Sequence, residues 1–199
     1  MKKILLLLSL GISSAFAENN HGFLYQGEPI NPACVAMFNS SEADFPYISS
    51  INLNVCQRSN AAFKKTMQNK NVYYFYNNGK NIDDGSYGYK VVGKSKNNIY
   101  VLGTSSSGGG TLVATDLLLV KLVKSNQYVY DGPQLKINKI TEMKLLGYVM
   151  GGDRCVGAFA NVQIVNNNLK IKQFNDANAG GECKKTRKYA INLSGLNRL

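Results

Sequence analysis

The sequence predicts a mainly β protein, an antiparallel barrel or sandwich whose strands follow one another as a meander. β-favouring segments recur about every 8–15 residues, and turns rich in Gly, Asn, Asp and Ser separate them. A helical pattern is nearly absent, apart from one short segment near residues 59–69. The length of 199 residues suits one ordinary domain with its own core, and no internal repeat or linker divides the chain.

The first 17 residues have the pattern of a secretory signal peptide. Lys2 and Lys3 precede a short apolar run over 4–10, and Ala15-Phe16-Ala17 matches a cleavage site. The run is shorter than the about 20 apolar residues that a membrane-spanning helix needs, and no other stretch approaches that length. We therefore expect an exported protein, in the bacterial periplasm or outside the cell, with a single disulfide-stapled domain over residues 18–199 and no transmembrane span.

All four cysteines lie after this segment, and an even count in an oxidising compartment predicts two disulfides. Of the three possible connectivities, the local one is favoured because short loops close at the least entropic cost. It pairs Cys34 with Cys56 and Cys155 with Cys183. No Cys-x-x-Cys motif is present, so a thioredoxin-type redox role is not expected.

The N-terminal part of the mature chain, residues 18–54, lacks any regular period and is expected to be irregular. Pro32, Pro46 and many Ser and Asn residues interrupt it. The helix expected near residues 59–69 begins at a capping Ser59 and places Phe63 and Met67 on one face.

The middle of the chain then reads as strands. The runs 72–76, 87–92 and 98–102 favour β structure, and Asn78-Gly79 is a strong hairpin signal. The Ser/Gly segment 104–110 is expected to be a flexible loop. It differs from a phosphate-binding loop because Gly109 stands where the essential lysine would be.

A long apolar stretch over 112–123 predicts a central strand buried on both faces, and Asp131-Gly132-Pro133 predicts the turn after 128–130. The run 135–146 alternates, with Met143 on one face and Glu142 on the other. Gly151-Gly152-Asp153 predicts another turn.

The C-terminal strands are expected at 162–165, 169–174 and 189–193, with the turn Asn166-Asn167-Asn168 between the first two. Leu169 and Ile171 alternate with lysines, which predicts a half-exposed strand.

Net charge points to anionic partners. Removing Lys2 and Lys3 from the 23 Lys and Arg residues leaves 21 against 12 Asp and Glu, a net charge of +9. The excess is uneven, because residues 18–110 carry +2 and residues 111–199 carry +7. A basic half favours nucleic acid, lipopolysaccharide, acidic glycan or acidic protein as a partner, although solubility alone also accounts for such a charge.

Two sets of basic residues are the candidate polyanion site. One set places four cations within five residues directly after Cys183; the other lies on the polar faces of expected strands and forms a positive face if those strands are neighbours. The alternative is an ordinary solvated face whose lysines protect strand edges. The candidates are Lys184, Lys185, Arg187 and Lys188, with Lys136, Lys144, Lys170 and Lys172.

Catalytic sets are poorly supported. His21 is the only histidine and lies near the expected mature terminus, which argues against histidine-dependent nucleophilic catalysis and histidine metal clusters. Asp83 and Asp84 precede a glycine and read as turn residues. A carboxylate pair remains open among Asp116, Glu142 and Asp153, which lie on different expected elements. We expect no catalytic residue, no metal site and no cofactor.

Seven aromatic residues cluster in the middle of the chain. We expect cross-strand packing with hydroxyl groups at the surface, although aromatic residues beside cations also stack on bases and sugars. The set is Tyr73, Tyr74, Phe75, Tyr76, Tyr87, Tyr89 and Tyr100.

These observations predict a non-enzymatic binding protein whose basic surface meets an anionic macromolecule or an acidic protein. Three alternatives stay open: an enzyme that uses carboxylates, a small-ligand carrier with a β-barrel interior, and an outer-membrane barrel with a weak strand pattern.

Overall fold

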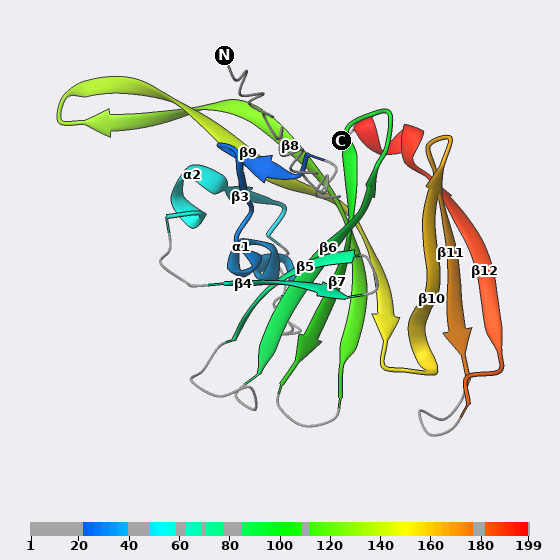
Figure 1. Ribbon diagram of the computed structural model, residues 1–199. Helices are drawn as coiled ribbons and strands as arrows, with labels where there is room; N and C mark the ends of the chain where they lie inside the picture. The colour runs from blue at the N-terminus through cyan, green and yellow to red at the C-terminus, as the bar shows by residue number, and fades with distance from the viewer. Residues whose placement is uncertain are drawn as a thin grey trace, which may run out of the picture.

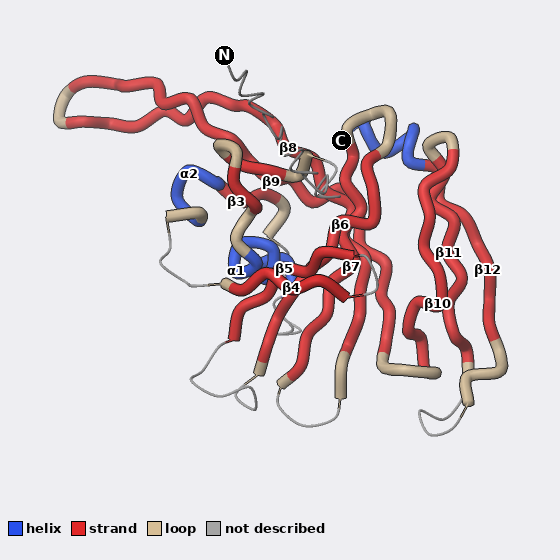
Figure 2. Tube along the Cα trace, in the orientation of Figure 1, coloured by secondary structure: helices blue, strands red, loops and turns tan. Residues whose placement is uncertain are grey.

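The computed structural model describes residues 22–39, 48–58, 63–68, 71–77, 85–108, 112–176 and 182–198. It confirms the prediction of a mainly β, antiparallel fold, because strands dominate these ranges and the only α-helices within them are two short ones (Figure 2). In chain order the elements are β1 (Leu24–Tyr25), β2 (Glu28–Pro29), α1 (Pro32–Ala36), η1 (Met37–Asn39), β3 (Ser50–Asn52), α2 (Leu53–Cys56), β4 (Lys64–Gln68), β5 (Asn71–Asn77), β6 (Ser86–Lys94), β7 (Ile99–Ser107), β8 (Ala114–Asp131), β9 (Gln134–Gly152), β10 (Val156–Val165), β11 (Asn168–Asn175), β12 (Thr186–Asn192) and η3 (Leu193–Arg198).

A seven-stranded sheet forms the centre of the molecule, in the order β3-β9-β8-β7-β6-β5-β4. Strands β4 to β9 follow one another as the predicted meander, and β3 pairs antiparallel with the outer edge of β9. The sheet ends at β3 and β4 and does not close into a barrel. A separate three-stranded sheet, β10-β11-β12, stands beside it (Figure 1), so a sandwich-like arrangement fits and the barrel alternative is wrong.

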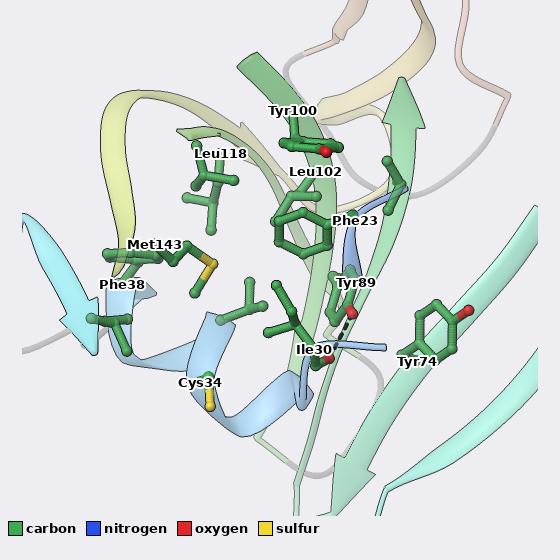
Figure 3. Packing of buried hydrophobic residues seen from close by; sticks show 14 of the residues in the cluster. Phe23, Ile30, Cys34, Phe38, Tyr74, Tyr89, Tyr100, Leu102, Leu118 and Met143 are labelled. Carbon is green, nitrogen blue, oxygen red and sulfur yellow. Dashed lines mark hydrogen bonds between the residues drawn. The ribbon is translucent and has the colours of Figure 1, made fainter. Parts of the chain in front are cut away.

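The N-terminal segment covers one face of the large sheet. Phe23 and Ile30 from this segment are buried against Tyr89 and Leu102 of the sheet (Figure 3), and Val35 belongs to the same buried cluster. The Tyr89 hydroxyl donates a hydrogen bond of 2.6 Å to the Ile30 carbonyl oxygen. This bond joins the two layers inside the core. Residues 18–54 are thus less irregular than expected, since their described part holds a hairpin, two short helices and a strand.

The three-stranded sheet covers the opposite face of the large sheet. Val101 and Leu119 of the large sheet are buried together with Leu169 and Ile171 of β11. Leu193, at the start of η3, closes the same cluster. Strand β8 therefore contributes to both cores, because Leu118 belongs to the first core and Leu119 to the second. The prediction of a strand buried on both faces holds for residues 117–120, whereas Leu112 and Val113 precede β8 and are exposed.

Two glycines let the chain pass from one sheet to the other. A Cβ at Gly151 would lie 1.7 Å from the Thr115 carbonyl oxygen, and one at Gly152 would lie 1.9 Å from the Val156 carbonyl oxygen. No side chain fits at either position. Both glycines belong to β9, and the predicted turn forms one residue later, where Asp153 bridges to Val156.

Two disulfides are present, and they have the local connectivity that the sequence favours. Cys34–Cys56 joins α1 to α2, with a Cα–Cα distance of 5.8 Å. Cys155–Cys183 joins the chain before β10 to the chain before β12, with a Cα–Cα distance of 4.9 Å.

Two local predictions are wrong. The segment Lys64–Gln68 is strand β4 rather than part of a helix, because it pairs antiparallel with β5 along its whole length. Ladder pairing here overrides weak helix propensity. Residues 104–107, expected in a loop, continue β7 and pair with β6 and β8. Ser59, Asn78, Gly79 and Gly109 lie outside the described residues.

The hairpin of β8 and β9 extends far beyond the rest of the large sheet (Figure 1). The last contact of β8 with β7 is at Lys121, and β3 reaches β9 only over residues 142–144. From Lys124 and Thr141 outward, the two strands pair only with each other. We call this projecting part, residues 124–141, the arm.

Among the described helices, none is long and apolar enough to cross a membrane.

Candidate polyanion-binding surface

Three of the predicted basic residues come together on the outer face of the three-stranded sheet. Lys170 and Lys172 lie two residues apart on β11, and Lys188 lies on β12 directly opposite Lys172. All three residues are exposed. We call this surface the lysine face.

Alternation along the strands sets which side chains reach this face. Leu169 and Ile171 point into the core, so the residues between and after them point outward. Strand β10 follows the same rule, because Val162 and Ile164 pack inward and leave their neighbours exposed.

Amide side chains border the lysines. Asn161 of β10 is opposite Lys172, and Gln163 is opposite Lys170. Together with Ala190 of β12 these residues line a shallow depression of about 520 Å³. The sequence reasoning missed Asn161 and Gln163, although the alternation of 161–164 between polar and apolar residues was a signal for them.

The charged side chains of the lysine face are all positive. Opposite residues in an antiparallel pair have Cα atoms about 4.5–5.5 Å apart, so Lys172 and Lys188 place two like charges side by side. None of the residues of β10, β11 and β12 is an aspartate or glutamate. Within the described part of the chain, the ammonium groups of Lys170, Lys172 and Lys188 have no ion-pair partner.

Lys184 and Lys185 lie at one end of this sheet, directly after the Cys155–Cys183 disulfide. Their backbone N–H groups donate to the Asp176 carboxylate, at 3.0 Å from Lys184 and 3.1 and 3.2 Å from Lys185. The side chains of both lysines are exposed. Asp176 thus holds the backbone of Lys184 and Lys185 in place, at the same end of the sheet as the Cys155–Cys183 disulfide.

Arg187 points to the other side of β12 and does not join the lysine face. Its Nε and Nη2 donate to Oε1 of Gln173 at 2.9 and 2.7 Å, and the Tyr189 hydroxyl donates to the same oxygen at 3.0 Å. Gln173 is buried, and its Nε2 donates to the carbonyl oxygens of Met150 and Gly157. This arginine is therefore part of a network that holds the two sheets together.

The remaining two candidates lie on the other sheet. Lys136 is near the tip of the arm, where it forms an ion pair with Asp131. Lys144 is on β9, opposite Lys121 of β8 and Ser50 of β3. The structure therefore does not place all the strand lysines on one sheet face, and the reason is that β9 and β11 belong to different sheets.

Each of the three carboxylate candidates has hydrogen-bond donors of its own. Asp116 accepts from the Gly151 N–H at 2.9 Å, and Asp153 accepts from the Val113 N–H at 3.4 Å. Glu142 lies at the base of the arm, where it accepts from the hydroxyl groups of Ser50 and Ser125, both at 2.8 Å. Hydrogen bonds from Ser125 and Ser50 hold the pKa of Glu142 below its usual range. Glu142 is therefore a structural anchor between three strands. Asp83, Asp84 and His21 lie outside the described residues.

Four of the seven aromatic residues pack in the core as predicted, but their hydroxyl groups are less exposed than expected. Tyr74, Tyr87, Tyr89 and Tyr100 are buried in the first core. Burial raises the pKa of the Tyr89 hydroxyl well above its usual value, and the neighbouring tyrosines add to this rise.

A cleft of about 530 Å³ lies between the sheets. Tyr73 and Lys90 of the large sheet line one side, with the Lys90 ammonium 5.3 Å from the centre of the Tyr73 ring, and Phe159 of β10 lines the other. The small-ligand-carrier alternative is based on the interior of a closed barrel. Because the large sheet is open, this cleft is the space in which that alternative would place a small ligand.

Comparisons of this chain with protein-family models, with curated proteins and with solved structures found no match.

Proposed function

We propose that this protein is a non-enzymatic binding protein whose lysine face holds a linear polyanion, with an acidic glycan as the ligand class. One observation carries the proposal: Lys170, Lys172 and Lys188 lie close together without an acidic partner among the described residues. Like charges directly opposite each other destabilise a sheet, so an anionic ligand would relieve a repulsion that is present in the free protein.

The composition of the lysine face favours a glycan over an acidic protein. Energetically dominant residues at protein interfaces are enriched in Trp, Tyr and Arg. The face instead combines lysines with Asn161, Gln163 and Ala190 around a shallow depression. Amide groups donate to and accept from hydroxyl groups, and lysines supply charge for carboxylate or sulfate groups.

Export is part of the proposal. The expected signal peptide over 1–17 and the two disulfides fit an oxidising compartment, where an envelope or host polyanion would be met. Lys184 and Lys185 add exposed positive charge at one end of the sheet.

The test is binding of mature, oxidised protein to heparin, used as a model acidic glycan. The triple variant Lys170→Gln, Lys172→Gln, Lys188→Gln should lower the affinity at least about tenfold, because the loss of even one hydrogen bond to a charged group costs about 1.5 kcal/mol. The matched control carries the same charge change at exposed lysines elsewhere, Lys64→Gln, Lys96→Gln and Lys144→Gln, and should retain most of the affinity. Equal losses in the two variants would reduce the effect to net charge, and no binding by the unaltered protein would end the proposal.

A second candidate function is favoured by the cleft between the sheets. Lys90 and Gly103 both line the cleft, and a Cβ at Gly103 would meet the Lys90 Cε at 3.4 Å, so a large side chain at this position would fill space beside the Lys90 ammonium. A small anionic or aromatic ligand in the cleft would raise the unfolding midpoint in a ligand screen, and Gly103→Leu would remove that rise. Ligands that stabilise both proteins equally would contradict this second function.

A further inference from the structure

The arm exposes four large apolar side chains on one face. Tyr128 is opposite Ile137, and Tyr130 is opposite Leu135. Their exposed fractions are 63%, 58%, 79% and 53% in the same order. Isolated apolar residues at a surface are ordinary, but two adjacent cross-strand pairs form a contiguous patch of the kind that marks an interaction surface.

Two lysines lie on the same face, closer to the body of the protein. Lys124 is opposite Thr141, and Lys139 is opposite Asn126. Each lysine is an even number of residues from the apolar residues on its own strand, so its side chain points to the same face. They line a depression of about 480 Å³ at the base of the arm, together with Gln26 of the N-terminal hairpin.

The acidic residues near the arm lie outside this face. Asp131, at the tip, is paired with Lys136. Glu142 is an odd number of residues from Lys139 on β9, so its side chain points to the other face, where it accepts hydrogen bonds from Ser50 and Ser125. This face of the arm therefore combines two lysines with a patch of aromatic and aliphatic side chains, and none of the residues on this face is acidic.

The arm is anchored at its base. Asn54 of α2 accepts from the Thr141 N–H at 2.9 Å and donates to the Lys139 carbonyl oxygen, and Asn52 donates to Gln127. The Cys34–Cys56 disulfide in turn holds α2 against α1. These contacts fix the direction in which the arm leaves the body (Figure 1).

Two other roles fit this face less well. In a symmetric dimer, two copies of the face would offer the lysines of either copy no acidic partner, because the only acidic residue of the arm, Asp131, lies on the other face and pairs with Lys136. The apolar patch takes up only 128–130 and 135–137, whereas a membrane-spanning strand needs about 9–11 residues.

We propose that this face of the arm docks onto a membrane surface that contains anionic lipids. Tyr128, Tyr130, Leu135 and Ile137 enter the interfacial region, where amphipathic tyrosine rings are favoured, and Lys124 and Lys139 meet lipid phosphate groups. The inference goes beyond the proposed function and does not depend on it, because the arm and the lysine face belong to different sheets.

The chain contains no tryptophan, so a single Tyr130→Trp substitution provides a fluorescent reporter on the apolar patch. The matched control is Val129→Trp, at the neighbouring residue on the opposite face. Vesicles of phosphatidylcholine and phosphatidylglycerol in equal amounts should shift the emission of Tyr130→Trp to the blue and protect it from a soluble quencher. Pure phosphatidylcholine vesicles should give a much smaller shift, and Val129→Trp should stay exposed to the quencher in both.

Charge variants then test the lysines. In the Tyr130→Trp background, Lys124→Gln with Lys139→Gln should lower the affinity for the anionic vesicles about 25-fold, since each lysine near an anionic surface contributes about fivefold. Lys136→Gln, on the other face of the same arm, should leave the affinity nearly unchanged. Far-UV circular dichroism checks that each variant retains the fold.

Three outcomes would overturn the inference. Emission that stays unshifted with anionic vesicles excludes docking by this face. A blue shift that needs no vesicles and grows with protein concentration means that a second copy covers the arm. Loss of vesicle binding in the triple variant Lys170→Gln, Lys172→Gln, Lys188→Gln, with the arm variants unaffected, assigns the membrane to the lysine face instead.

Discussion

Lys172 and Lys188 lie directly opposite each other on β11 and β12, with Lys170 two residues away on the same face. The backbone positions from which the two side chains start cannot separate without leaving the alternation that buries Ile171 and half-buries Tyr189 beneath them. The sheet thus holds a concentration of positive charge in place through its own core. This link between packing and charge leads to the first prediction.

Lys188→Glu should stabilise the protein and weaken polyanion binding. The substitution replaces a like-charge pair by an opposite-charge pair with Lys172, which is worth up to about 1 kcal/mol and about 2–4 °C in Tm. Thermal unfolding and heparin binding measure the two effects. Lys96→Glu, at an exposed turn position, is the control for net charge and should raise Tm less. A lower Tm for Lys188→Glu would show that the two lysines do not repel each other.

Tyr89→Phe should destabilise the protein by about 1–3 kcal/mol, because it leaves the Ile30 carbonyl oxygen buried without its donor. Urea unfolding measures the change. Tyr100→Phe removes a longer, part-buried hydrogen bond to the Gly22 carbonyl oxygen and should cost less. A larger loss in Tyr100→Phe would contradict the ranking of the two bonds.

Tyr89 also predicts an alkaline dependence of stability. Burial raises the pKa of its hydroxyl in the folded state above the unfolded value of about 10. Its contribution is therefore complete below about pH 10 and declines as pH rises further, since only the unfolded chain then loses the proton. The free energy of unfolding of Tyr89→Phe should fall less steeply above about pH 10 than that of the unaltered protein. Parallel curves would refute this.

Glu142 predicts an acid dependence of the opposite sign. Hydrogen bonds from Ser125 and Ser50 lower the pKa of its carboxyl group in the folded state. The stabilisation is present above the unfolded pKa of about 4.3 and is lost as pH falls through the lowered folded value. Glu142→Gln should flatten this loss, and so should the double variant Ser50→Ala, Ser125→Ala, which removes the donors and keeps the carboxylate. Acid titrations of stability that match the unaltered protein would argue against the bridge.

Replacing Cys155 and Cys183 by serine should cost about 3–4 kcal/mol, the loop-closure value for the sequence separation of 28. Hydrogen exchange should speed up mainly in β10, β11 and β12, because the bond joins the start of β10 to the chain before β12. Serine at Cys34 and Cys56 is the matched control and should act on the N-terminal layer. Exchange that rises equally over both sheets would contradict this division.

The strand pattern of the second half of the chain could be predicted from the sequence because its side chains alternate cleanly. Leu169 to Lys172 and the segment around Met143 expose one face and bury the other, and the structure keeps both assignments. The connectivity of the two disulfides could be predicted from the entropy of loop closure, because each cysteine pairs with the one that closes the shorter loop along the chain.

Other features depend on contacts that no local pattern contains. The segment Lys64–Gln68 has helix-compatible residues and becomes a strand because β5 offers it an edge. Whether a strand lysine reaches the lysine face depends on which sheet its strand joins, and that choice separates Lys144 from Lys172. Arg187 looked like a free cation in the basic run, but the buried Gln173 opposite it on β11 engages its guanidinium.

The measurement that tests the central claim most directly is the salt dependence of binding to double-stranded DNA, used as a polyanion of known charge spacing. The logarithm of the association constant falls with the logarithm of salt concentration by about 0.9 per phosphate neutralised. If the lysine face makes the contact, the triple variant Lys170→Gln, Lys172→Gln, Lys188→Gln should flatten that slope by about two to three, one increment for each lysine. Parallel lines for the two proteins would contradict the account and leave the positive charge as a matter of solubility.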